Sequence, residues 1–268
     1  MMLVQRNLKL RKSNMNVSLR KSNMNMPQKF LLFLLTLGLS PFIIADDHVP
    51  VPQPIEFWGC EFNDGKTMDD LMPVIKEWKK TMGKQDYVGW VMTPTFVSEG
   101  YSSSVGFTGW WPDWSSMGKT LDHISEKVAP KMDPKWAEVI TCETHMIATG
   151  ITTRTAENED NDSAVMNYSQ CTLNDGKTPQ DVLKATGAFN KFLDKIGVTE
   201  MSAGILFPGT GAPDGADHAI TFWVPSMTAM GDLAQKFISN GGPQVQQDLF
   251  GDLQQCNNGS QFSGFQIY

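Results

Sequence analysis

The chain has 268 residues, of which 41% are hydrophobic and 19% charged, a balance typical of a folded globular protein rather than a disordered one. This length allows one large domain or two of ordinary size. The formal net charge of −7 argues against non-specific binding to nucleic acid or to anionic membranes, because both need a basic surface. We therefore expect neither as a partner.

The N-terminal region predicts export. Residues 26–45 contain a short basic lead, the mostly apolar run Phe30–Ser40 and a small-residue end at Ala45, which is the layout of a secretory signal peptide. The apolar run is too short and too broken for a good membrane span. We therefore expect a periplasmic or secreted protein with no membrane anchor after cleavage.

Residues 1–25 do not fit a targeting sequence. Seven residues beginning at Leu10 recur in the same order from Leu19. We interpret this stretch as upstream sequence wrongly assigned to the protein, with Met26 as the true start. A long natural leader is the alternative.

The rest of the chain contains one module twice. Its clearest mark is Cys-x-x-Asn-Asp-Gly-Lys-Thr at Cys60–Thr67 and again at Cys171–Thr178. Two further matches follow in the same order: Trp-x-Pro at Trp110 and Trp223, and a last cysteine at Cys142 and Cys256. Three ordered matches predict a duplication, divided into a linker at 46–54, repeat 1 at 55–155, an acidic linker at 156–166 and repeat 2 at 167–268.

Each copy predicts the same series of elements. Alternating or β-branched runs indicate strands, and apolar residues spaced by three and four indicate helices. Copy one has predicted strands at Ile55–Phe62, Tyr87–Thr93, Val105–Trp111 and Trp136–Met146, with helices starting after Thr67 and at Met117–Val128. Copy two has predicted strands ending at Leu173 and at Met201–Phe207, Ala219–Val224 and Phe262–Tyr268, with helices at Thr178–Ile196 and Met227–Ser239. The order β-α-β-β-α-β is that of the ferredoxin-like module.

Two such modules in tandem resemble the dimeric α/β-barrel superfamily. The resemblance covers roughly Ile55 to Tyr268, and the doubled cysteine motif is also similar to that of uncharacterised exported bacterial proteins. It implies an α+β fold in which two ferredoxin-like βαββαβ repeats form an intramolecular dimeric α/β barrel around a cavity. Because both halves are in one chain, the protein is expected to be monomeric.

The four cysteines favour disulfides, since an even number in an exported protein is typical of paired thiols. In a ferredoxin-like sheet the first and last strands are neighbours. This topology predicts the pairs Cys60–Cys142 and Cys171–Cys256. Other pairings also respect the repeat, so symmetry alone does not decide.

The shared Asn-Asp-Gly-Lys-Thr loop has two interpretations. A turn before a helix N-terminus can hold an anion, with a lysine adding charge. The spacing is not that of a phosphate loop, and a tight turn followed by a capped helix explains the same residues. We favour the structural interpretation for Asn63, Asp64, Lys66, Asn174, Asp175 and Lys177.

Tryptophans are the candidates for ligand binding. Seven of the chain's eight tryptophans lie in or beside copy one. Such a cluster can hold an aromatic or sugar-like ligand, although core packing also uses tryptophan. The candidate ligand-binding residues are Trp90, Trp110, Trp111 and Trp223.

Residues that differ between the copies are the candidates for catalysis. His145 and His218 could act as a general base or ligate a metal, although a lone histidine is more often a polar strand residue. Glu143 lies beside the first, and Arg154 could bind an acidic ligand. No familiar hydrolase, metalloprotease, dinucleotide or calcium motif occurs, so we predict neither a metal nor a cofactor.

Two functions remain open from the sequence. The first is binding of a small apolar or aromatic ligand in the cavity between the repeats. The second is a dimeric α/β-barrel enzyme, monooxygenase-like or haem-dependent, in which the histidines would act. A purely structural or stress-related module is a third possibility, because a fold does not choose a function.

Overall fold

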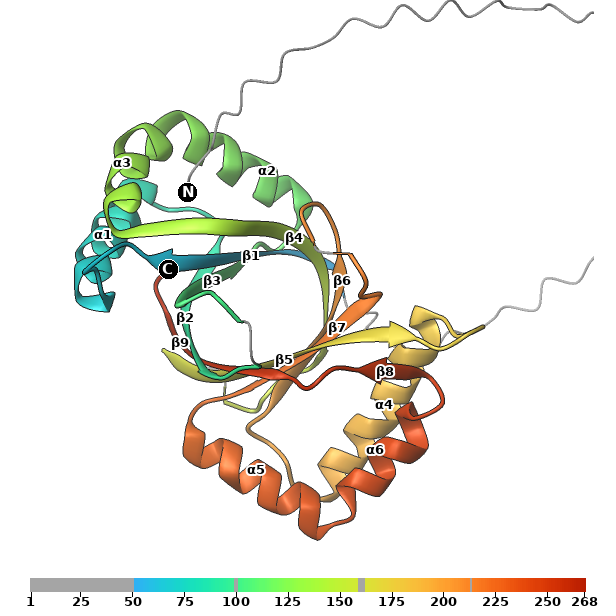
Figure 1. Ribbon diagram of the computed structural model, residues 1–268. Coiled ribbons are helices and arrows are strands. Elements are labelled where there is room, and N and C mark those ends of the chain that lie inside the picture. The colour runs from blue at the N-terminus through green and yellow to red at the C-terminus, as the bar shows by residue number, and fades with distance from the viewer. Residues whose placement is uncertain (1–50, 99–100, 159–161, 213) are drawn as a thin grey trace, which may run out of the picture. The chain divides into compact units, whose positions relative to one another are not determined.

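The computed structural model describes residues 51–98, 101–158, 162–212 and 214–268 (Figure 1). The predicted signal peptide and upstream stretch, residues 1–45, lie outside the described residues. Within the described part of the chain, no helix combines the length and the apolar character needed to cross a membrane.

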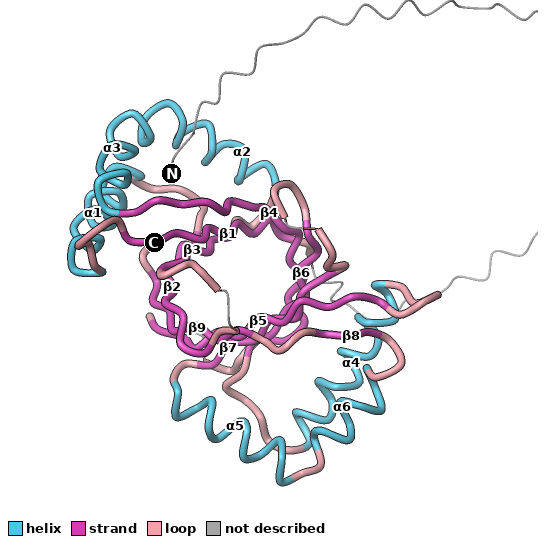
Figure 2. The backbone as a smooth tube through the Cα atoms, in the orientation of Figure 1, coloured by secondary structure: helices cyan, strands magenta, loops and turns pink. Residues whose placement is uncertain are grey.

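Eight antiparallel strands close into a barrel with helices on its outside (Figure 2). Their order is β7-β6-β4-β1-β3-β2-β9-β5, and β5 pairs back with β7 to complete the ring. The short strand β8 pairs with β5 outside the ring. The strands are β1 (Gln53–Phe62), β2 (Val88–Phe96), β3 (Val105–Trp110), β4 (Ile140–Arg154), β5 (Ser163–Leu173), β6 (Ser202–Pro208), β7 (His218–Val224), β8 (Gln254–Cys256) and β9 (Ser260–Gln266).

The helices form two groups, one on the outer face of each half of the barrel (Figure 1). The first group is α1 (Met68–Met82), α2 (Trp114–His123), the π-helical segment η1 (Ile124–Val128) and α3 (Ala129–Val139). The second group is α4 (Pro179–Lys195), α5 (Met227–Ser239) and α6 (Gly242–Phe250). Each group packs its apolar side chains against the sheet of its own half.

Each half has the strand order of a ferredoxin-like sheet. The first half runs β4-β1-β3-β2 and the second runs β9-β5-β7-β6. The halves meet where β2 pairs with β9 and β4 pairs with β6. The predicted fold, two βαββαβ repeats forming an intramolecular dimeric α/β barrel, is therefore confirmed. Each sheet has helices on one face only, and the sheet of the other half covers its second face.

Side-chain alternation along the strands separates two compartments. On β1, Glu56 and Trp58 point toward the helices of the first half. Phe57, between them, points into the barrel, where its ring lies 5.6 Å from that of Tyr168. The molecule therefore has a helix-side core in each half and a third cluster inside the barrel.

Both disulfides form as predicted. Cys60 lies opposite Cys142 on β1 and β4, with 3.9 Å between the two Cα atoms. Cys171 lies opposite Cys256 on β5 and β8, with 4.0 Å between the two Cα atoms. Each bond therefore joins the first strand of a half to a strand near that half's end.

Several predicted boundaries are wrong. The predicted strand Trp136–Met146 begins only at Ile140, because α3 continues to Val139 and buries Trp136 on the helix face that also carries Met132. The predicted linkers 46–54 and 156–166 are too long, since β1 starts at Gln53 and β5 at Ser163. Both strands begin with a polar residue, and the sequence pattern did not predict these ends as strand. They are stabilised by pairing with β4 and β9, which are distant in sequence. The sequence analysis also did not predict α6 or β8.

Candidate functional site

The interior of the barrel holds three adjoining cavities among the described residues, of about 230, 260 and 370 Å³. The first two share Trp90, Trp110 and Trp223 in their walls. The second and third share Phe57 and Tyr168. Ligand sites in proteins commonly measure about 300–1,000 Å³. The barrel interior is therefore a ligand-sized space walled by both halves.

Three of the four candidate tryptophans line this space. Trp90 and Trp110 come from β2 and β3 of the first half, and Trp223 comes from β7 of the second half. Trp111 is different, because its side chain is fully buried in the core, with its ring 4.9 Å from that of Tyr87. Trp111 is the first residue after β3, and its side chain does not line the barrel cavities as that of Trp110 does.

The walls of the barrel cavities carry polar as well as apolar side chains. The indole nitrogen of Trp90 is buried without a hydrogen-bond partner among the described residues. Buried polar atoms usually have a partner, so this donor is available to an acceptor on a bound molecule. The Tyr168 hydroxyl lies close to the sulfurs of Met92 and Met166, and burial raises its pKa above the ordinary value. Tyr168 is therefore a neutral donor at physiological pH.

His218 lines the barrel cavity of about 370 Å³. It is 1% exposed, and its Nε2 lies 2.7 Å from the Gln254 amide oxygen, while Nδ1 has no partner among the described residues. An amide oxygen accepts a hydrogen bond, so this contact places the proton of the neutral ring on Nε2. Burial lowers the pKa of the imidazole. His218 is thus a neutral histidine with a free lone pair on Nδ1.

The pH dependence of stability provides a test of this state. The folded pKa of His218 lies below the ordinary value of about 6.5. The unfolded chain therefore binds the proton more readily, and stability is lost as the pH falls below about 6.5. We expect the free energy of unfolding to fall less between pH 7 and pH 5 in His218→Gln than in the wild type. Equal slopes in urea unfolding would show that this histidine is not held neutral.

His145 belongs to the other compartment, on the helix side of the first half. Its ring stacks on Trp58, with centroids 3.4 Å apart. Its Nε2 lies 3.3 Å from a carboxyl oxygen of Glu56, a residue that the sequence analysis did not select. The two candidate histidines therefore do not share a site.

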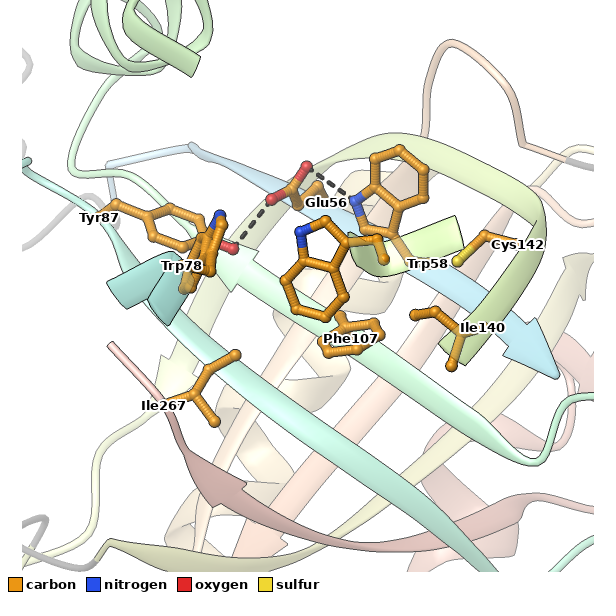
Figure 3. A pocket seen from close by; sticks show the side chains of 9 residues that line it. Glu56, Trp58, Trp78, Tyr87, Phe107, Ile140, Cys142 and Ile267 are labelled. Carbon is orange, nitrogen blue, oxygen red and sulfur yellow. Dashed lines mark hydrogen bonds between the residues drawn. The ribbon is translucent and has the colours of Figure 1, made fainter. Parts of the chain in front are cut away.

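Glu56 is 3% exposed and lies on β1 between aromatic side chains (Figure 3). The Tyr87 hydroxyl donates to one carboxyl oxygen at 2.9 Å, and the Trp58 indole N–H donates to the other at 3.1 Å. Burial, followed by the nearby Glu56, raises the pKa of Tyr87 well above its ordinary value, so the phenol keeps its proton.

A signal for Glu56 was present in the sequence. It stands four residues before Cys60, and the residue four before Cys171 is Asn167. The difference between the copies was the criterion used for His145 and His218.

Glu143 and Arg154 are not part of either compartment. Glu143 is exposed on β4. Arg154 bonds to Asp194 of α4 through Nη1 at 2.6 Å and to the Val198 carbonyl through Nη2. The guanidinium therefore ties the end of β4 to the α4 region, and it does not line the cavities described above.

The Asn-Asp-Gly-Lys-Thr loops form turns at the ends of β1 and β5. In both copies the glycine has a positive φ, 72° at Gly65 and 75° at Gly176, a conformation that suits a residue without Cβ. In both copies the threonine and an aspartate three residues later form a capping box. The six loop residues Asn63, Asp64, Lys66, Asn174, Asp175 and Lys177 thus lie in two equivalent helix-capping turns.

No family model matches the sequence, and no curated protein matches it either. Solved structures do match the fold. A proposed monooxygenase of Fusobacterium nucleatum aligns with 82% of this chain and 94% of its own, at 9% identity and a TM-score of 0.53. The chlorite dismutase of Candidatus Nitrospira defluvii, in its complex with imidazole, aligns with 80% of this chain and 90% of its own, at 9% identity and a TM-score of 0.49. The likeness to the Fusobacterium nucleatum structure shows the dimeric α/β-barrel fold, and the enzyme alternative stays a prediction.

The prediction that the chain takes no cofactor is contradicted by these matches. A haem-binding protein of Thermus thermophilus aligns with 82% of this chain and 95% of its own, at 10% identity and a TM-score of 0.44. The sequence analysis excluded cofactors because it found no familiar motif. A cavity formed by tertiary structure needs no such motif, so the exclusion was not justified.

Proposed function

We propose that this protein binds an uncharged, planar aromatic compound with an oxygen acceptor in the cavities between its two halves. The observation that carries the proposal is the shared wall of Trp90, Trp110 and Trp223, to which both halves contribute. Indole rings favour offset or edge-on packing against other aromatic rings. A carbonyl or hydroxyl oxygen on the ligand would accept the unpartnered N–H of Trp90.

The character of the walls supports an uncharged ligand. Among the described residues that line the three barrel cavities there is no lysine or arginine. Glu200 is the acidic side chain in these walls, at the cavity of about 230 Å³. An anionic ligand would therefore lose its hydration without gaining a cationic partner, which costs free energy.

Haem meets this description only in part. Met92, Met146, Tyr168 and His218 line the cavity of about 370 Å³, and these residue types can ligate haem iron. The two propionates of haem, however, are negative, and the described walls offer them no cation. The residues fit an uncharged planar molecule better than haem, and we derive no iron chemistry from them.

Titration with 1-naphthol, an uncharged aromatic compound with a hydroxyl group, tests the proposal by calorimetry. We expect Trp223→Ala to weaken binding by about tenfold or more, since stacking on an aromatic side chain contributes roughly 1–3 kcal/mol. Trp114→Ala is the matched control, because Trp114 is 46% exposed on α2. Equal affinity of the wild type and Trp223→Ala for 1-naphthol would contradict the proposal. A haem titration that gives a Soret shift and displaces naphthol would instead assign the cavity to haem.

We further propose that the protein acts in an oxidising compartment outside the cytoplasm. The two disulfides support this, because such bonds persist in secreted and periplasmic proteins and are rare in the cytosol. Mass spectrometry of the protein recovered from its native compartment tests it. Free thiols at all four cysteines would contradict the proposal.

A further inference from the structure

A second pocket lies between the sheet of the first half and helices α1 and α3. Its volume is about 60 Å³, far smaller than the barrel cavities. The lining residues are Glu56, Trp58, Trp78, Tyr87, Phe107, Trp136, Ile140, Cys142 and Ile267. Figure 3 shows aromatic side chains around the carboxyl group of Glu56. The pocket therefore combines apolar walls with one acidic group and suits a small head group.

The acidic group has no cationic side chain of lysine or arginine in this lining. Its hydrogen-bond donors are the neutral Tyr87 and Trp58 and the ring of His145, whose side chain is 38% exposed. Of these three donors, only the His145 ring can carry a positive charge, and a buried carboxylate is stabilised most by a charged partner. A pocket with apolar walls and one polar group is a candidate ligand site.

The aromatic walls suit a cation as well. The ring centroids of Trp78 and Trp136 are 6.4 Å apart, and those of Phe107 and Trp136 are 5.7 Å apart. The faces of aromatic rings carry negative electrostatic potential and attract cations, ammonium groups in particular. In addition, the indole N–H of Trp136 is buried without a partner among the described residues, although the residue lines the pocket. A bound molecule with an oxygen atom would satisfy that donor.

The second half of the chain shows which of these pocket residues are needed to pack helices on the sheet. At the offsets of the repeat, Phe189 and Phe250 occupy the places of Trp78 and Trp136, and their centroids are 5.7 Å apart. Asn167, in the place of Glu56, bonds to the sulfur of Met230 and to Gln261. Helices thus pack on an equivalent sheet without a carboxylate. The acidic group of the first half is therefore not a requirement of the fold.

We propose that this pocket binds a small organic ammonium ion, with Glu56 as its counter-ion and the indole rings of Trp58, Trp78 and Trp136 as its walls. A hard metal ion is a poor alternative, because calcium or magnesium takes about six oxygen ligands or more. Among the described residues no cluster of three or more His, Cys, Asp or Glu side chains can hold a metal. The site is separate from the proposed barrel function and does not depend on it.

Choline and 3,3-dimethylbutan-1-ol form a matched pair of probes, because they have nearly the same shape and a hydroxyl group but only choline is charged. With the full chain, calorimetry is expected to show saturable binding of choline and at least about tenfold weaker binding of the neutral alcohol. This comparison needs no variant. Equal binding of the two probes, or no binding of choline, would overturn the proposal.

The variant Glu56→Gln keeps the size of the side chain and removes its charge. We expect it to weaken choline binding by at least about tenfold and to leave the weak binding of the neutral alcohol unchanged. Trp223→Phe, in the barrel wall, is the control and should bind choline as the wild type does. A folded Glu56→Gln protein with wild-type choline affinity contradicts the assignment. The same variants are also titrated with 1-naphthol, so that a failure of the choline proposal can be told apart from a failure of the barrel proposal.

Discussion

A variant in which Cys60 and Cys142 are both replaced by alanine is expected to lose up to about 4.5 kcal/mol of unfolding free energy. The disulfide spans 82 residues, and constraint of an unfolded loop of that length gives ~4.5 kcal/mol on the chain-entropy model. Cys60 is also 1% exposed, so its removal leaves a small gap in the core of the first half. Equilibrium unfolding in urea measures the change.

The second disulfide provides the matched comparison. Cys171→Ala with Cys256→Ala opens a span of 85 residues and is expected to lose a similar free energy. The local effects should differ, because β1 and β4 are paired from Phe62 back to Gln53, whereas β5 and β8 share three residue pairs. Amide exchange in β8 should therefore become fast only in the second variant. If both double variants lose less than about 1 kcal/mol of unfolding free energy, the chain-entropy explanation is contradicted.

Gly109→Ala is expected to destabilise the protein by about 1–3 kcal/mol, the usual cost of inserting a group into a well-packed core. Gly109 faces Gly89 on neighbouring strands, and the Tyr87 ring lies against both. A Cβ at 109 would meet the hydroxyl oxygen and ring carbons of Tyr87 well inside contact distance. The ring would have to move away from Glu56 and break its hydrogen bond. Urea unfolding measures the loss.

Gly187→Ala is the control for this substitution. Gly187 lies in α4, where an added Cβ meets nothing within 4 Å. Alanine there should raise stability by about 0.5–1 kcal/mol, because glycine loses more backbone freedom on folding. If both variants have the same stability, the packing of Tyr87 on the two glycines does not constrain the sheet.

The candidate site could be predicted only in part. Tryptophan is large and amphipathic, so its presence near strand ends drew attention to Trp90, Trp110 and Trp223, which line the barrel cavities. Trp111 was selected for the same reason, but it follows β3 and is buried in the core against Tyr87. Glu56 was missed because a single acidic residue in a strand reads as solvent-exposed until the helices that cover it are placed.

The sequence by itself predicted the duplication and the ferredoxin-like order of elements, and the strand order of that fold in turn predicted the partners of Cys60 and Cys171. Those features depend on local patterns, namely turn residues, helix caps and spacing, that recur at a nearly constant offset. Only the tertiary structure decided which side chains share a space. The closing pair β5–β7 and the cross-half pairs β2–β9 and β4–β6 bring together residues far apart in the chain. Cavity walls and buried charges arise from that closure, because burial is a property of the whole fold.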